Sequence, residues 1–127
     1  MDLKSYKNTE MEQMVGVLRK HLERRDIVGY AAARNTRILQ NELKEYIERR
    51  DELVRKYGDS DVDADGNPTG SVSLSFDSPN FPKFAEEIEQ YATIEHSPNI
   101  MQLKYEDAIG ILSGAEILEL DWMFKEE

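Results

Sequence analysis

The stretch of sequence that decides the fold is IVGYAAARNTRILQNELKEYIERRDELVRKY, residues Ile27–Tyr57. Its apolar residues recur at spacings of four and three, the period of one face of an α-helix. The stripe consists of Leu39, Leu43, Tyr46, Leu53 and Tyr57, with Arg50 filling one position. We therefore predict one long helix over about 27–57, preceded by a break at Asp26 and ended by Gly58.

A shorter helix is predicted before it. Thr9 and Glu12 have the spacing of a capping box, in which each side chain bonds the other residue's free backbone N–H. The apolar residues that follow keep to one helical face: Met11, Met14, Val15, Leu18 and Leu22. We expect this helix to run from Thr9 to about Arg25.

The middle of the chain predicts a strand and a third helix. Val72, Leu74 and Phe76 alternate with serines, as in a half-buried strand. A helix is expected from about Asn80, because Pro82 is tolerated in a first helical turn.

The C-terminal part predicts a short helix over 105–112 and a last helix that a capping box of Ser113 and Glu116 opens. We therefore expect an α+β, predominantly helical fold. It would pair the long helix with the shorter N-terminal helix and add a small antiparallel β element and two or three C-terminal helices.

Length and composition indicate one domain over 1–127, since single domains cluster near ~100–150 residues. Residues 58–70 are rich in turn-forming and acidic residues, which predicts a flexible acidic loop. The net charge of −10 is uneven: residues 1–57 carry 13 basic against 10 acidic side chains, whereas 58–127 carry 3 against 16. The absence of cysteine excludes disulfides and thiol catalysis.

The sharpest local motif is Asp61-Val62-Asp63-Ala64-Asp65-Gly66, whose alternating carboxylates resemble the start of an EF-hand calcium loop. The twelfth position, where a bidentate Glu belongs, is Val72, and a strand rather than a helix is expected to follow. We interpret the segment as a solvated turn and keep Asp61, Asp63 and Asp65 as the candidate metal ligands.

Other candidate sites are few. Arg24, Arg25 and Arg34 could contact nucleic acid, but the net charge of −10 repels a polyanion, so we do not expect nucleic acid as the main partner. His21 and His96 have no third ligand at metal-site spacing. The chain contains no phosphate-binding glycine loop, HExxH or GxSxG motif. We therefore expect no enzymatic activity and no cofactor.

Leu120-Asp121-Trp122-Met123-Phe124 contains the single tryptophan. Large apolar side chains in this segment could form a docking element, since tryptophan and methionine are favoured at interfaces. The alternative is that the segment covers the core.

The length of the predicted helix suggests self-association. About 30 residues would extend roughly 45 Å, whereas a compact domain of this size is about 36 Å across. We therefore expect a homo-oligomer whose interface is the stripe of Leu39, Leu43, Tyr46, Leu53 and Tyr57, unless the helix kinks near Gly29 or Asn35.

Several stretches together resemble a family of small phage- and prophage-encoded proteins of unknown function. They include Tyr30-Ala31-Ala32-Ala33-Arg34-Asn35, Arg49-Arg50-Asp51-Glu52-Leu53, the Asp65-Gly66-Asn67-Pro68 turn and Leu120-Asp121-Trp122-Met123. The resemblance covers about residues 30–123. It implies a phage or prophage origin, and it supplies no catalytic residues. Without cysteine or a recognisable signal or membrane-spanning segment, we expect a cytoplasmic setting, here that of a bacterial host cell.

We therefore expect a non-enzymatic interaction protein, an assembly or accessory factor that associates with itself or with another phage or host protein. No membrane association is expected, since the longest apolar stretch, 27–33, is far short of the ~20 residues of a spanning helix. Two alternatives remain open. One is a nucleic-acid-associated regulatory factor that uses the arginines, and the other is an acidic decoy that binds a basic host protein.

Overall fold

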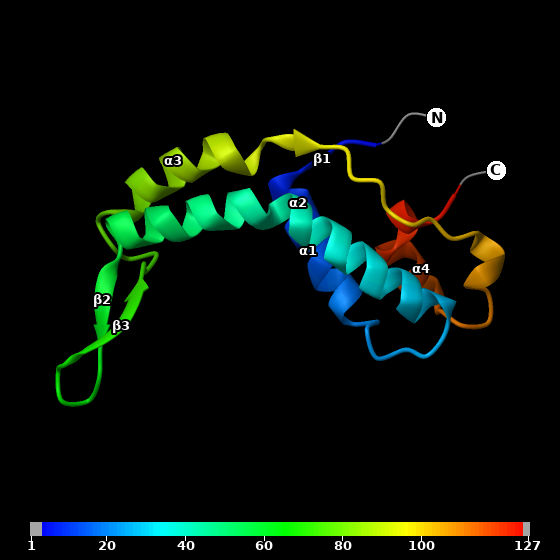
Figure 1. The fold of residues 1–127 in the computed structure, drawn as a ribbon, viewed down its shortest axis with the longest axis horizontal. Coiled ribbons are helices and arrows are strands. Elements are labelled where there is room, and N and C mark those ends of the chain that lie inside the picture. The colour runs from blue at the N-terminus through cyan, green and yellow to red at the C-terminus, as the bar shows by residue number, and fades with distance from the viewer. Residues whose placement is uncertain (1–3, 126–127) are drawn as a thin grey trace. The chain divides into compact units, whose positions relative to one another are not determined.

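The structure, a computed structural model, describes residues 4–125. Its elements in chain order are β1 (Tyr6–Lys7), α1 (Asn8–Arg19), α2 (Ile27–Tyr57), β2 (Asp59–Val62), β3 (Pro68–Ser73), α3 (Phe81–Ala92), β4 (Glu95–His96) and α4 (Gly114–Glu119) (Figure 1). Two short 3₁₀ helices, η1 (Tyr105–Asp107) and η2 (Asp121–Met123), flank α4. The predicted α+β, mostly helical fold is confirmed, with the long helix packed against the shorter N-terminal one.

The chain divides into two compact units. One comprises the described residues up to Leu43 together with those from Glu95 onward, and the other comprises Lys44–Ile94. The division falls within α2, so each unit contains part of this helix. The sequence predicts one domain and contains no signal for this division.

Helix α2 has the predicted bounds, and Asp26 explains its start. The Asp26 Oδ1 atom accepts a hydrogen bond from the Gly29 N–H (3.0 Å), which satisfies one of the free donors in the first turn. The Arg24 guanidinium holds the same carboxylate, with an Nη2–Oδ2 distance of 3.0 Å. Asp26 is therefore the N-cap residue of the helix as well as the predicted break.

Helix α1 is shorter than predicted. It begins at Asn8, with Glu10 accepting a hydrogen bond from the Lys7 N–H (3.0 Å), and it ends at Arg19. The predicted end near Arg25 is wrong, because the chain must reverse before α2. Turn hydrogen bonds replace helical ones there, for example from the His21 N–H to the Leu18 carbonyl (2.9 Å).

The core of the first unit lies between α1, the first part of α2 and the C-terminal segment. Its buried apolar residues are Met11, Met14, Val15, Leu18, Val28, Ala31, Ala32, Leu39, Leu43, Leu103, Ala108, Leu112, Leu120, Met123 and Phe124. Strands β1 and β4 pair antiparallel at its edge, with Tyr6 opposite His96. The C-terminal segment is anchored by a hydrogen bond from the Leu103 N–H to the Met123 carbonyl (2.8 Å).

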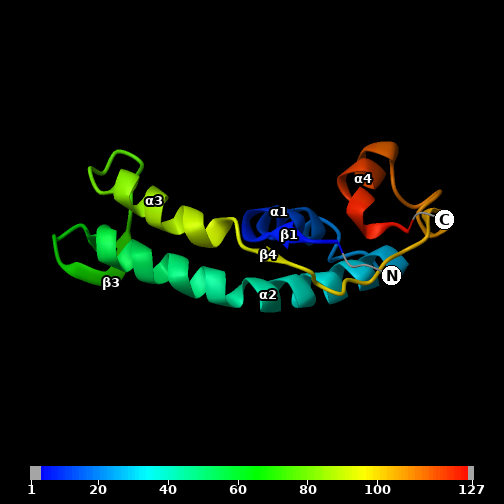
Figure 2. The ribbon, with the colours of Figure 1, turned by 90° about the horizontal axis from the view of Figure 1, so that it is seen from above.

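The second unit combines the rest of α2 with α3 and a hairpin. Figure 2 shows α3 alongside this part of α2, and Glu87 joins the two helices by accepting hydrogen bonds from Lys56 (3.3 Å) and the Tyr57 hydroxyl. Strands β2 and β3 form the antiparallel hairpin, so residues 58–70 are not the flexible loop that the sequence predicts. The strand ends at Ser73 and does not reach Phe76, which is 85% exposed.

The C-terminal elements are also shorter than expected. Only the 3₁₀ helix η1 forms within the predicted helix over 105–112, and the last helix is confined to Gly114–Glu119. The capping box at its start is confirmed. The Ser113 N–H donates to the Glu116 carboxylate (2.9 Å), and the Glu116 N–H donates to the Ser113 Oγ atom (3.1 Å).

Asp26→Ala is expected to lower the free energy of unfolding at pH 7 by about 1 kcal/mol, a common cost of losing an N-cap. The Gly29 N–H and the Arg24 guanidinium hold the pKa of the Asp26 carboxyl below its usual value of 3.8. A lowered folded-state pKa means that this stabilisation is complete above pH 3.8 and is lost as the pH falls through the folded-state pKa.

Urea unfolding of both proteins between pH 2 and 7 measures the effect. Asp26→Asn is the control, because it retains the capping oxygen but lacks the charge. Its difference from the wild type should disappear in acid. A difference that stays constant from pH 7 to 2 would show that the charge of Asp26 contributes nothing.

Candidate functional site

The residues predicted to form a self-association interface are not exposed. Leu39 and Leu43 are at most 2% exposed within the first unit. Tyr46 and Leu53 are at most 9% exposed within the second, and Tyr57 is half-buried. The chain itself covers this stripe, so the predicted interface is wrong at these residues. Self-association by another surface stays a prediction.

The three arginines proposed as nucleic-acid contacts divide into two groups. Arg24 is held inside its own unit, because its Nη2 atom donates to the Ile111 carbonyl (3.0 Å) as well as to Asp26. Arg25 and Arg34 are exposed. Arg24 is therefore a structural residue that connects the start of α2 to the C-terminal segment, rather than a free phosphate ligand.

The aspartates of the calcium-like motif bond to their own hairpin. The Asp63 carboxylate accepts hydrogen bonds from the N–H groups of Asp65 (2.9 Å) and Asn67 (3.0 Å), and the Ser73 hydroxyl donates to Asp61 (2.6 Å). Gly66 adopts a φ of 82°, which favours glycine. The interpretation as a turn is confirmed. Across residues 4–125, no three His, Asp or Glu side chains cluster in a way that could hold a metal ion.

Both histidines lie beside a carboxylate in the first unit. His21 is 3% exposed, and its Nδ1 atom lies 3.8 Å from Glu116. His96 pairs with Glu42 rather than with its neighbour Glu95, at an Nδ1–Oε2 distance of 3.1 Å. The second pair connects β4 to α2 and so fixes the strand that carries His96.

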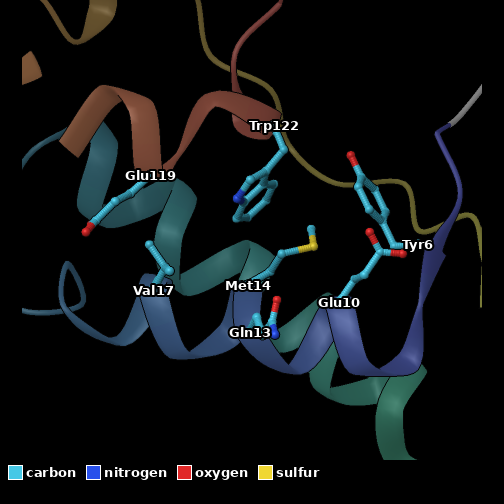
Figure 3. A pocket seen from close by; sticks show the side chains of 7 residues that line it. All are labelled: Tyr6, Glu10, Gln13, Met14, Val17, Glu119 and Trp122. Atoms are coloured by element: carbon cyan, nitrogen blue, oxygen red, sulfur yellow. The ribbon is translucent and has the colours of Figure 1, made fainter. Parts of the chain in front are cut away.

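The candidate functional site is a pocket in the first unit, beside Trp122. Its volume is about 280 Å³, and it is lined by Tyr6, Glu10, Gln13, Met14, Val17, Glu119 and Trp122. Four of these residues follow one face of α1 at spacings of three and four, which places them in a row along the helix. Figure 3 shows the Trp122 indole above this row, with Tyr6 and Glu10 at one end and Glu119 at the other.

Local structure explains how these side chains meet. The 3₁₀ helix η2 buries Met123 and leaves Trp122 half-buried at the pocket. Strand β1 pairs with β4 and so places Tyr6 next to the start of α1. The Trp122 segment therefore covers the core, as one of its two interpretations predicts, and a docking role stays a prediction. Leu120, Met123 and Phe124 cover the core, and Trp122 faces the pocket.

The pocket combines aromatic surface with negative charge. Burial, and secondarily the nearby charge of Glu10, raise the pKa of the Tyr6 hydroxyl above its usual value of 10.0, so this group stays neutral near pH 7. Glu119 forms an exposed ion pair with Lys20, with an Nζ–Oε1 distance of 3.5 Å. Carboxylates beside aromatic faces attract cations, since the face of an aromatic ring is negative.

Most of this pocket was not predicted from the sequence. The sequence marks Trp122 as a docking candidate and Met14 as a core residue, but its patterns do not single out Tyr6, Glu10, Gln13, Val17 or Glu119. Glu10, Gln13 and Val17 share a helical spacing that could have marked one face of α1. No sequence signal connects that face to Trp122, which lies more than 100 residues later.

Comparison with protein-family models, with curated proteins and with solved structures finds no match. The resemblance to phage and prophage proteins therefore stays a prediction. The helices formed by residues 4–125 lack the apolar run that a membrane-spanning helix needs.

Proposed function

We propose that this chain is a non-enzymatic binding protein that captures a basic segment of a partner protein at the pocket beside Trp122. The observation that supports this function is the arrangement of Glu10 and Glu119 at the two ends of a pocket lined by Tyr6 and Trp122. Aromatic faces with carboxylates nearby suit the guanidinium of arginine or the ammonium of lysine.

The size of the pocket supports a side chain as its occupant. Pockets for drug-sized ligands and cofactors commonly measure about 300–1,000 Å³, so 280 Å³ is at or below the lower limit. One arginine or lysine side chain needs less space than a cofactor. The net charge of −10 would also attract a basic partner and increase the rate of encounter.

We expect a peptide of alternating arginine and alanine to bind the full chain, with an affinity that falls as salt is added. Binding should change the fluorescence of Trp122, which is the single tryptophan. Calorimetry gives the dissociation constant without relying on that residue. Glu10→Gln and Glu119→Gln should each weaken binding by a factor of about 1.4 to 5, since exposed ion pairs contribute about 0.2–1 kcal/mol. Trp122→Ala should weaken it by a similar factor.

Glu23→Gln is the matched control, because Glu23 is exposed in the first unit and does not line the pocket. It removes the same charge and should change affinity less than either pocket substitution. Circular dichroism checks that each variant is folded. If the peptide does not bind at low salt, or if Glu23→Gln weakens binding as much as the pocket variants, the proposed function is wrong.

A further inference from the structure

We infer that the pocket beside Trp122 selects an arginine over a lysine side chain and holds the plane of its guanidinium against the Trp122 indole. This inference rests on the proposed function, which requires one basic side chain in the pocket, and it names which one. It follows from the kind of surface that lines the pocket.

Most of the surface around the occupant is aromatic or apolar. Figure 3 shows the Trp122 and Tyr6 rings on either side of the Met14 side chain. Val17 lies three residues beyond Met14 on the same face of α1. Trp122 is half-buried, and Met14 is only 6% exposed. A cation that enters this pocket therefore exchanges water for aromatic rings and a thioether.

The pocket offers few charged acceptors to replace that water. The Glu10 Oε1 atom already accepts the Lys7 N–H at the start of α1, at 3.0 Å. The Glu119 carboxylate faces Lys20, with an Nζ–Oε1 distance of 3.5 Å. The remaining polar groups of the lining are neutral. The strongest hydrogen bond open to an occupant is therefore a single one, to the Glu10 Oε2 atom.

This lining suits a guanidinium better than an ammonium. The lysine ammonium is compact and strongly hydrated, and two of its three N–H donors would lose water here without gaining a charged acceptor. The arginine guanidinium is planar and more weakly hydrated, and its face stacks on aromatic rings while its N–H groups donate from its edge. An arginine can therefore use both the Trp122 ring and the single carboxylate of Glu10.

The arginine–alanine peptide and a lysine–alanine peptide of the same length and charge test the inference, by calorimetry on the full chain. The arginine peptide should bind about two- to fivefold more tightly, the factor that corresponds to a cation–π contact at an accessible site. Trp122→Leu should remove this preference, because leucine is apolar but has no ring. Tyr30→Leu is the matched control and should keep the preference, since Tyr30 is an exposed aromatic residue of the same unit outside the pocket. Glu10→Gln should weaken both peptides by a similar factor and also keep the preference.

A measurement on the wild type does not depend on the folding of Trp122→Leu. With each peptide at equal saturation, acrylamide should quench the fluorescence of Trp122, the single tryptophan, less in the arginine complex than in the lysine complex. Equal quenching in the two complexes would show that the guanidinium does not cover the indole, and the inference would be wrong.

The outcomes separate this inference from the proposed function. If the two peptides bind the wild type equally, and Glu10→Gln weakens both, the inference is wrong and the proposed function stands. A preference for arginine that persists in Trp122→Leu arises outside the pocket and also overturns the inference. If neither peptide binds, the proposed function itself fails.

Discussion

Asn35→Ala is expected to lower the free energy of unfolding by about 3 kcal/mol, because it leaves two backbone groups of Met101 without their partner. The Asn35 side chain is fully buried. Its Nδ2 atom donates to the Met101 carbonyl (2.9 Å), and its Oδ1 atom accepts from the Met101 N–H (2.6 Å). These two bonds hold an irregular segment, which has few backbone bonds of its own, against α2.

Chemical denaturation gives the change in stability, and hydrogen exchange at the Met101 amide reports the local effect. Asn41→Ala is the matched control, since Asn41 is an exposed residue of the same helix and alanine favours helix formation. It should be neutral or slightly stabilising. Equal unfolding free energies for the wild type and Asn35→Ala would show that the Met101 contacts do not stabilise the fold.

Gly29→Ala is expected to destabilise the chain by about 2–4 kcal/mol, the range of severe packing conflicts. A Cβ atom at this position would lie 2.0 Å from the Arg24 carbonyl oxygen and 2.8 Å from the Arg24 carbonyl carbon. Both are backbone atoms, so the turn before α2 would have to move. That movement would disturb the Arg24–Asp26 ion pair and the capping bond from Gly29 itself.

The sign of this effect is informative, because alanine favours helices over glycine by about 1 kcal/mol. Gly16→Ala is the control. Gly16 lies in α1, and a Cβ atom added there meets no atom within 4 Å. Thermal unfolding should show a higher midpoint for Gly16→Ala and a lower one for Gly29→Ala. A higher midpoint for both would mean that the turn adapts to the added methyl group without cost.

The pocket shows why a binding site is harder to predict than a helix. Helix α2 is marked by neighbouring residues: an apolar period, Asp26 before it and Gly58 after it. The pocket instead requires Glu10 and Trp122 to meet, and nothing local to either residue indicates the other. Strands β1 and β4 have two residues each, too few for an alternating pattern, yet their pairing places Tyr6 beside the pocket.

The interface prediction failed for a related physical reason. A stripe of leucines shows that one face of α2 must be covered, but the hydrophobic effect has no direction and does not specify which surface covers it. Leu39 and Leu43, which belong to the first unit, and Tyr46 and Leu53, which belong to the second, are all at most 9% exposed in the single chain. An oligomer was therefore unnecessary to bury these residues.

The sequence by itself determined the start and end of α2, the Ser113–Glu116 capping box, the turn at Gly66 and the uneven charge, since each depends on residues within a few positions of one another. Only the tertiary structure decided that Arg24 bonds to the Ile111 carbonyl, that α1 stops at Arg19, and that Trp122 lines one pocket with Glu10 and Glu119. These features depend on contacts between distant segments. Such contacts are selected by packing and hydrogen bonding of the whole unit, and no short stretch of sequence encodes them.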